Sequence, residues 1–197
     1  MKYCNQCGEK VDQAIPENDN RLRYVCVSCE TIHYQNPNIV AGTLPLIMGD
    51  DGREKVLLCK RAIEPRYGLW TLPAGFMENG ETVEAAALRE SQEEANVELD
   101  NLKLYSVMSM PQINQVYMIF KGDIVGNSFS PGIESLETQL FDEEDIPWSE
   151  MAFNVITQTL QCYFDDRKKQ HRSQLTDYQV HNLVYQVPKK YLNTDKT

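Results

Sequence analysis

Hydrophobic positions divide the chain into a short N-terminal part and a longer part with regular periodicity. Residues 1–36 show almost no periodic apolar pattern, whereas the sequence that follows reads as apolar strands separated by polar turns. The apolar run 39–48 ends at the turn-forming cluster 49–52, and a second apolar run covers 56–59. This arrangement predicts a β-hairpin.

A helix is predicted over residues 82–95. Thr82 suits the N-cap, Glu84 suits the first turn, and the alanines that follow are strong helix formers. Further strands are predicted over 69–72, 98–109, 115–120 and 137–142, and an amphipathic helix over 148–169. We therefore expect a small domain over 1–36, a larger domain over 37–170, and a tail over 171–197 with only a weak strand signal at 182–185.

Composition narrows the range of partners. The chain has 197 residues, of which 42% are hydrophobic, so it can bury a core. Asp and Glu outnumber Lys and Arg by 29 to 19, and because nucleic-acid binders carry an excess of basic residues, we expect no nucleic-acid partner. No run approaches the about 20 apolar residues of a membrane span. The first residues contain no apolar signal segment, so we expect a cytoplasmic protein with no membrane partner.

Four of the six cysteines form two Cys-x2-Cys pairs, Cys4 with Cys7 and Cys26 with Cys29. Each pair directs two sulfurs at one point, and two pairs complete a tetrahedron around zinc. In a reducing compartment this spacing favours a metal over the alternative of two disulfides. Since thiolates fill all four ligand positions, we expect a structural Zn²⁺ that stabilises a segment too short to build its own core.

A run of carboxylates on the predicted helix is the second chemical signal. Glu90, Glu93 and Glu94 fall within a fan of about 100° around the helix axis. A solvated acidic face is the common alternative for such a run. Arg89 stands four residues before Glu93 and can offset part of the repulsion. Oxygen ligands on a rigid helix suit Mg²⁺ or Mn²⁺, which keep positions for water and for a substrate phosphate.

This stretch resembles the Nudix box of the Nudix hydrolases, in the pattern Gly75-x5-Glu81-x7-Arg89-Glu90-x2-Glu93-Glu94. The resemblance implies an α/β fold, an α/β/α sandwich preceded by a small zinc ribbon, and cleavage of nucleoside diphosphates linked to another moiety. Two positions depart from the pattern. Ser91 stands where an aliphatic residue is usual, which should slightly weaken core packing, and Asn96 stands where glycine is usual. Asparagine tolerates the left-handed backbone of a helix end.

A zinc ribbon that precedes a Nudix domain resembles the domain arrangement of NADH pyrophosphatases. It also resembles that of a related group of enzymes that act on ADP-ribose or FAD. The stretch 66–76 and the segment 134–137 look like the second group. The NADH-hydrolysing branch carries the motif Ser-Gln-Pro-Trp-Pro-Phe-Pro after the box, and this chain lacks it. The resemblance therefore implies cleavage of ADP-ribose or FAD with release of AMP. An NADH pyrophosphatase is the alternative, and a homodimer is a possible assembly.

The resemblance also implies which residues form the site. The metal ligands would be carboxylates of the helix and a backbone carbonyl before it, namely Glu90, Glu93, Glu94 and Gly75 or Ala74. The general base is left open among Glu93, Glu134 and Glu137. Arg61 and Arg66 suit phosphate, because a guanidinium group makes two parallel hydrogen bonds to it. Candidates for stacking on the base are Tyr67, Trp70 and Phe76, although aromatic residues in strand patterns are more often core.

Two other classes of function compete with a metal-dependent pyrophosphohydrolase. A Nudix-like module that binds a ligand without cleaving it commonly lacks box glutamates, and all are present in this chain. A zinc-ribbon interaction protein would need a basic surface. Residues 1–36 instead carry four Lys or Arg against five Asp or Glu, so this class is disfavoured.

Overall fold

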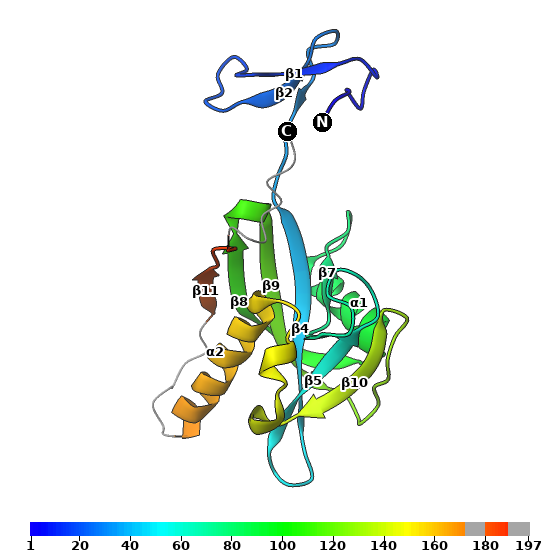
Figure 1. The fold of residues 1–197 in the computed structure, drawn as a ribbon, viewed down its shortest axis with the longest axis vertical. Coiled ribbons are helices and arrows are strands. Elements are labelled where there is room, and N and C mark those ends of the chain that lie inside the picture. The colour runs from blue at the N-terminus through cyan, green and yellow to red at the C-terminus, as the bar shows by residue number, and fades with distance from the viewer. Residues whose placement is uncertain (172–179, 189–197) are drawn as a thin grey trace. The chain divides into compact units, whose positions relative to one another are not determined.

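The computed structural model describes residues 1–171 and 180–188 (Figure 1). The chain divides into two compact units, and the division falls between Pro37 and Asn38. In the described part of the chain, no helix combines the length and the apolar character that crossing a bilayer requires.

The first unit is a three-stranded antiparallel sheet with very little apolar interior. Its strands are β1 (Val11–Ala14), β2 (Arg23–Cys26) and β3 (Ile32–His33), in the order β1-β2-β3. The buried cluster of this unit consists of Cys4, Val11 and Cys26, with Tyr24 packed against it. Two of the three side chains in this apolar cluster are therefore cysteines, and cross-links through their sulfurs must supply stability that apolar burial cannot.

The second unit contains an eight-stranded mixed sheet. Its strands are β4 (Asn38–Met48), β5 (Glu54–Arg61), β6 (Trp70–Thr71), β7 (Ala74–Phe76), β8 (Leu99–Met110), β9 (Gln115–Ile124), β10 (Ser135–Phe141) and β11 (His181–Val184). The strand order is β10-β5-β4-β9-β8-β11, with β6 paired to β5 and β7 paired to β4. The pairs β4–β9 and β8–β11 are parallel, and the other pairs are antiparallel.

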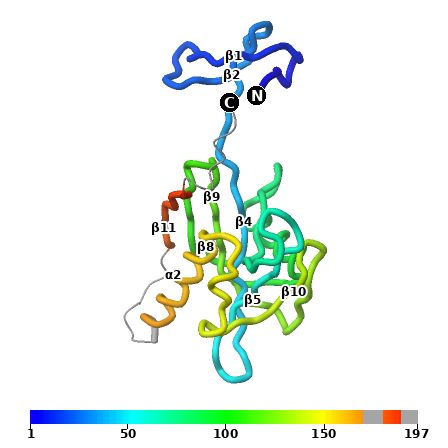
Figure 2. The backbone as a smooth tube through the Cα atoms, viewed as in Figure 1, coloured from blue at the N-terminus to red at the C-terminus, as the bar shows by residue number. Residues whose placement is uncertain are grey.

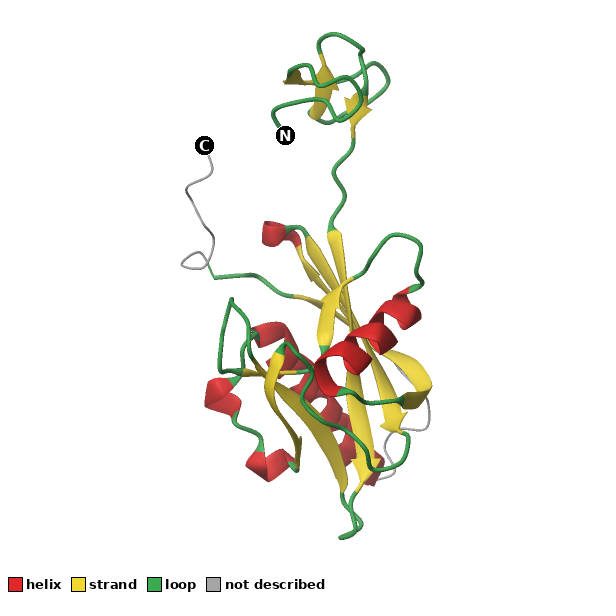
Figure 3. Cartoon of the chain, turned by 90° about the vertical axis from the view of Figure 1, so that its right-hand side faces the viewer, coloured by secondary structure: helices red, strands yellow, loops and turns green. Residues whose placement is uncertain are grey.

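The two helices, α1 (Val83–Ala95) and α2 (Asn154–His171), pack on opposite faces of this sheet (Figure 3). Side chains alternate along β4, so Ala41 joins the cluster under α1 while Leu44 and Leu46 join the cluster under α2. The result is the three-layer α/β/α arrangement that the resemblance implies. The predicted hairpin is also present, because Leu46 of β4 pairs with Val56 of β5.

The predicted boundaries hold for the first helix and fail for the second. Thr82 caps α1 and accepts a hydrogen bond from the Ala85 amide at 3.1 Å. The helix predicted over 148–169 is wrong at its start, since residues 148–150 form only a 3-10 turn (η3). The Ala152 amide donates to the Trp70 carbonyl at 2.8 Å, which ties this stretch to β6 in an extended form. The other 3-10 turns are η1 (Pro111–Ile113) and η2 (Glu143–Asp145).

The weak strand signal at 182–185 corresponds to β11, which lies along β8 (Figure 2). The pairing runs from His181 opposite Ser106 to Val184 opposite Ser109. Part of the expected tail thus belongs to the main sheet. The rest of it, 172–179 and 189–197, lies outside the described residues.

Candidate active site and cysteine cluster

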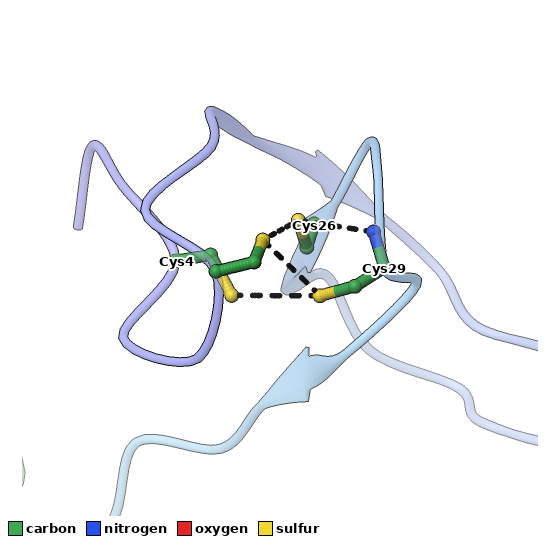
Figure 4. A group of neighbouring side chains, drawn as sticks. Cys4, Cys26 and Cys29 are labelled. Atoms are coloured by element: carbon green, nitrogen blue, oxygen red, sulfur yellow. Dashed lines mark hydrogen bonds between the residues drawn. The ribbon is translucent and has the colours of Figure 1, made fainter.

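The four paired cysteines converge in the first unit. The Sγ atoms of Cys4 and Cys29 lie 3.7 Å apart, and the Sγ atom of Cys7 lies 3.4 Å from those of Cys26 and Cys29 (Figure 4). All four sulfurs lie within 4.8 Å of one another, and all six cysteines of the chain are free thiols, so the disulfide alternative is not formed. Hydrogen bonds from the Thr31 side chain and amide lower the pKa of Cys29 to about 6, which favours a thiolate. The donor set is that of a zinc ribbon.

In the second unit, two carboxylates of α1 are buried against β7. Glu90 is 8% exposed and Glu94 is 5% exposed. Glu90 packs directly on Gly75, where an added Cβ would lie 2.4 Å from the Glu90 Cδ atom, so no side chain fits at that position. Glu94 accepts a hydrogen bond from the Ala74 amide at 3.2 Å. The glycine of the sequence pattern is therefore required by the close approach of a carboxylate.

Arg89 binds three carboxylates of this region. Its guanidinium donates to Glu90 at 2.7 Å, to Glu93 at 3.1 Å and to Glu81 at 2.9 and 3.1 Å. It also donates to the Phe76 carbonyl at 3.1 Å, and Glu81 accepts from the Glu78 amide at 2.6 Å. Glu81 thus braces the loop that precedes α1, and the Arg89 hydrogen bond lowers its pKa.

Burial disfavours the charged form of both glutamates. Burial, and then the charge of Glu90, raises the pKa of Glu94 to about 8. Burial also raises the pKa of Glu90, against the opposing effect of Arg89. Among the described residues only the cysteines already converge on one point, so the glutamates supply ligand types rather than a preformed cage. Two buried oxygen donors short of positive charge fit a hard divalent cation such as Mg²⁺ or Mn²⁺.

A pocket of about 1360 Å³ adjoins these carboxylates. Its lining includes three of the five expected substrate residues, Arg61, Arg66 and Phe76. Arg61 is buried, donates to the Pro65 carbonyl at 3.0 Å, and places its guanidinium 5.1 Å from the ring of Phe153. The lining contains further aromatic rings that sequence reasoning missed, Tyr117, Trp148, Phe153 and Tyr185.

The other two expected aromatic residues do not line the pocket. Trp70 is 5% exposed and packs edge-to-face on Phe141, with ring centroids 5.0 Å apart, so its assignment to base stacking is wrong. A two-residue strand places it in the core. Tyr67 is exposed and lies outside the lining.

The candidates for the general base differ in whether they line the pocket. Glu93 and Glu134 line the pocket, whereas Glu137 on β10 is half-exposed and pairs with Lys60 at 3.8 Å. Glu134 follows a loop that the end of α1 holds in place, because the Gly132 amide donates to the Glu94 carbonyl at 3.0 Å. An added Cβ at Gly132 would lie 1.7 Å from the Glu93 carbonyl oxygen.

The geometry matches a family of known proteins. The NUDIX domain model matches residues 39–157, and the Nudix N-terminal zinc-ribbon model matches residues 2–35. The chain belongs to the Nudix hydrolase family. A Nudix hydrolase structure from Nitrosomonas europaea is 47% identical and has a TM-score of 0.82, with 95% of this chain and all of that chain covered.

Two curated relatives of this Nudix hydrolase have different names. The NAD-capped RNA hydrolase NudC of Vibrio atlanticus is 28% identical over 172 residues, which cover 86% of this chain and 60% of that protein. The ADP-ribose pyrophosphatase of Methanocaldococcus jannaschii is 35% identical over 104 residues, which cover 51% of this chain and 60% of that protein. The chain thus spans three fifths of the length of each of these relatives.

The two departures from the Nudix box have partners elsewhere in the domain. Asn96 has the left-handed backbone expected at a helix end, with φ of 46°, and its side-chain amide donates to the carbonyls of Ser130 and Pro131 at 3.2 Å. It therefore fixes the loop before Glu134, which glycine could not do. Ser91 is fully buried, and its hydroxyl bonds to Thr43 at 2.7 Å and to the Ala87 carbonyl at 2.8 Å.

Proposed function

We propose that this Nudix hydrolase is a divalent-cation-dependent pyrophosphohydrolase that cleaves the diphosphate of ADP-ribose or FAD and releases AMP. The observation that carries the proposal is the position of Glu90 and Glu94, two buried carboxylates on a pocket that also presents Arg61 and Arg66. A carboxylate cluster alone would repel a diphosphate, and guanidinium groups alone would bind it without cleaving it. The combination suits phosphoryl transfer to water.

Each group of charged residues has a role in this proposal. Glu90, Glu93 and Glu94 would hold Mg²⁺ or Mn²⁺, with the carbonyl of Gly75 or Ala74 available beside them. When bound, the cation neutralises phosphate charge and activates water. Arg61 and Arg66, which line the same pocket, would bind the diphosphate. Glu134 is a better candidate base than Glu137, because it lines the pocket and its loop is fixed to α1.

The choice of substrate rests on likeness to relatives. The curated relative named ADP-ribose pyrophosphatase supports ADP-ribose, and the stretch 66–76 resembles the group that acts on ADP-ribose or FAD. The relative named NAD-capped RNA hydrolase favours a second candidate, cleavage of NAD-type ends, against which the missing NADH-type motif counts. The absence of a nucleic-acid partner therefore stays a prediction, as do a cytoplasmic location and a homodimer.

One assay tests the activity and ranks the substrates. Purified protein with Mg²⁺ is given ADP-ribose, FAD, NADH and an NAD-capped RNA, and the products are quantified. We expect the highest kcat/KM for ADP-ribose or FAD. Values for NADH or the capped RNA about tenfold above both would refute the ranking while leaving the hydrolase intact.

Two variants test the assigned carboxylates. Glu90→Gln and Glu94→Gln should each lower kcat by about two orders of magnitude or more, because each removes a charged ligand. Glu98→Gln is the matched control, since Glu98 is exposed and lies outside the pocket lining. Full activity of both site variants would contradict the proposal.

We also propose that the cysteine cluster binds one structural Zn²⁺. The four convergent sulfurs and the match to the zinc-ribbon model support this role. Because the cluster has no ligand position left for water or substrate, the zinc would take no part in hydrolysis.

A further inference from the structure

The segment 180–188 extends the Nudix sheet beyond the residues that match the family model. After β11, the Tyr185 amide donates to the Ser109 carbonyl at 3.0 Å and so continues the pairing with β8. Alternate residues of this segment are half-buried, and they include Leu183, Tyr185 and Val187, which pack against the main core. The residues between them are exposed.

This segment forms one wall of the pocket, since Tyr185, Val187 and Pro188 belong to the lining. The sheet register shows how far the wall stands from β7, the strand on which Glu90 and Glu94 pack. Neighbouring strands place lining residues in two adjacent rows, Phe76, Val40 and Tyr117 in one, and Gln115, Met110 and Tyr185 in the next. From β7 to the segment there are four strand spacings, or about 19 Å.

Side-chain contacts hold the segment in place. Asp166 of α2 accepts a hydrogen bond from the Tyr105 hydroxyl at 2.9 Å and contacts His181 Nε2 at 2.6 Å. Beyond the strand, the side-chain amide of Gln112 donates to that of Gln186. The wall is therefore anchored on both sides of Tyr185.

The two ends of the pocket have different chemistry. The end at α1 presents glutamates and arginines, which suit a diphosphate and its cation. The end at Tyr185 presents an aromatic ring beside Met110 and Val187, which suits a planar, weakly polar group. A sugar phosphate would gain little binding free energy from that surface, whereas a nucleobase would stack on it.

We propose that Tyr185 is a specificity-determining residue whose ring packs on the adenine base of the substrate, opposite the acidic helix. This inference rests on the proposed function and names a further part of the same site. It assigns recognition of the base to a segment outside the matched Nudix domain.

The test uses the two products of ADP-ribose cleavage as ligands, because AMP contains the base and ribose 5-phosphate does not. Their dissociation constants are measured by calorimetry with Mg²⁺, and kcat and KM are measured for ADP-ribose. The variants are Tyr185→Ala and Tyr185→Phe. Val184→Ala is the control, since Val184 is 65% exposed and lies outside the pocket lining.

We expect Tyr185→Ala to weaken AMP binding and raise KM about tenfold, while ribose 5-phosphate binding and kcat stay within about twofold. Tyr185→Phe should retain wild-type values, because it keeps the ring, and Val184→Ala should also match wild type. Unchanged AMP binding by Tyr185→Ala would overturn the proposal, as would equal weakening of both ligands or failure of Tyr185→Phe. If the wild type cleaves neither ADP-ribose nor FAD, the proposed function fails, and the binding measurements still decide the role of Tyr185.

Discussion

The charge of Glu94 should make the cation-free protein lose stability as the pH rises. Its carboxyl titrates at about 8 in the folded chain, against an ordinary value of 4.5. A raised folded pKa means that the stabilising contribution is complete below the ordinary value and is lost as the pH rises through the folded value. Above pH 8 the free energy of unfolding is lower by at most about 5 kcal/mol, which is a large fraction of the total stability of a domain.

Glu94→Gln removes this loss, because the amide has a similar shape and no charge to desolvate. Without added Mg²⁺ or Mn²⁺, we expect similar Tm values for variant and wild type near pH 5. By about pH 9 the variant should melt about 10 °C higher, from the usual relation between stability and Tm for a domain of this size. Added Mg²⁺ should raise the Tm of the wild type and leave that of the variant nearly unchanged.

The assay is thermal unfolding followed by circular dichroism across this pH range, with Glu98→Gln as the control that should follow wild type. The reasoning is refuted if wild type and Glu94→Gln give parallel curves of Tm against pH. It is equally refuted if Mg²⁺ stabilises both to the same extent, because then Glu94 holds no cation.

Three further predictions concern the framework around the site. Wild-type protein should contain about one zinc per chain by elemental analysis, and Cys26→Ser should lose that zinc. Proteolysis of this variant should be faster only within residues 1–37. A Cys26→Ser variant that keeps its zinc would exclude the four-thiolate site. Thr43→Val and Ser91→Ala should each lower the free energy of unfolding. A double-mutant cycle measured by urea unfolding should give a coupling energy of about 1 kcal/mol between the two residues. Strictly additive effects of the two substitutions would contradict the buried hydroxyl pair. Gly132→Ala should lower kcat because its Cβ must displace the loop before Glu134. Gly126→Ala strains the backbone at a φ of 67° but meets no neighbour within 4 Å, so it should retain kcat.

The residues that sequence analysis placed well are those tied together by helical spacing. Arg89, Glu90, Glu93 and Glu94 lie on one short helix with a clear N-cap, so their proximity follows from local geometry alone. The four cysteines were equally predictable, because each pair forms its own turn and the two turns need only meet.

Residues placed by long-range packing were not predictable in the same way. The burial of Trp70 depends on Phe141 of β10, more than 70 residues further along the chain. Glu134 and Glu137 look equivalent in sequence, but a register irregularity at the start of β10 separates a pocket residue from a partner of Lys60. No local pattern marks Tyr185 as a neighbour of the pocket, because its position depends on the pairing of β11 with β8.

The pairing of β11 also removes β8 from the edge of the main sheet. β8 is a twelve-residue strand, and without its neighbour the backbone groups of Ser106 to Ser109 would form an open sheet edge. Such an edge offers unpaired N–H and C=O groups to any other extended chain, including a second copy of this protein. β11 covers this edge of β8, and its exposed residues are Asn182 and Val184. Strand addition directly onto β8 would need β11 to detach first, and the contact between His181 and Asp166 opposes that detachment.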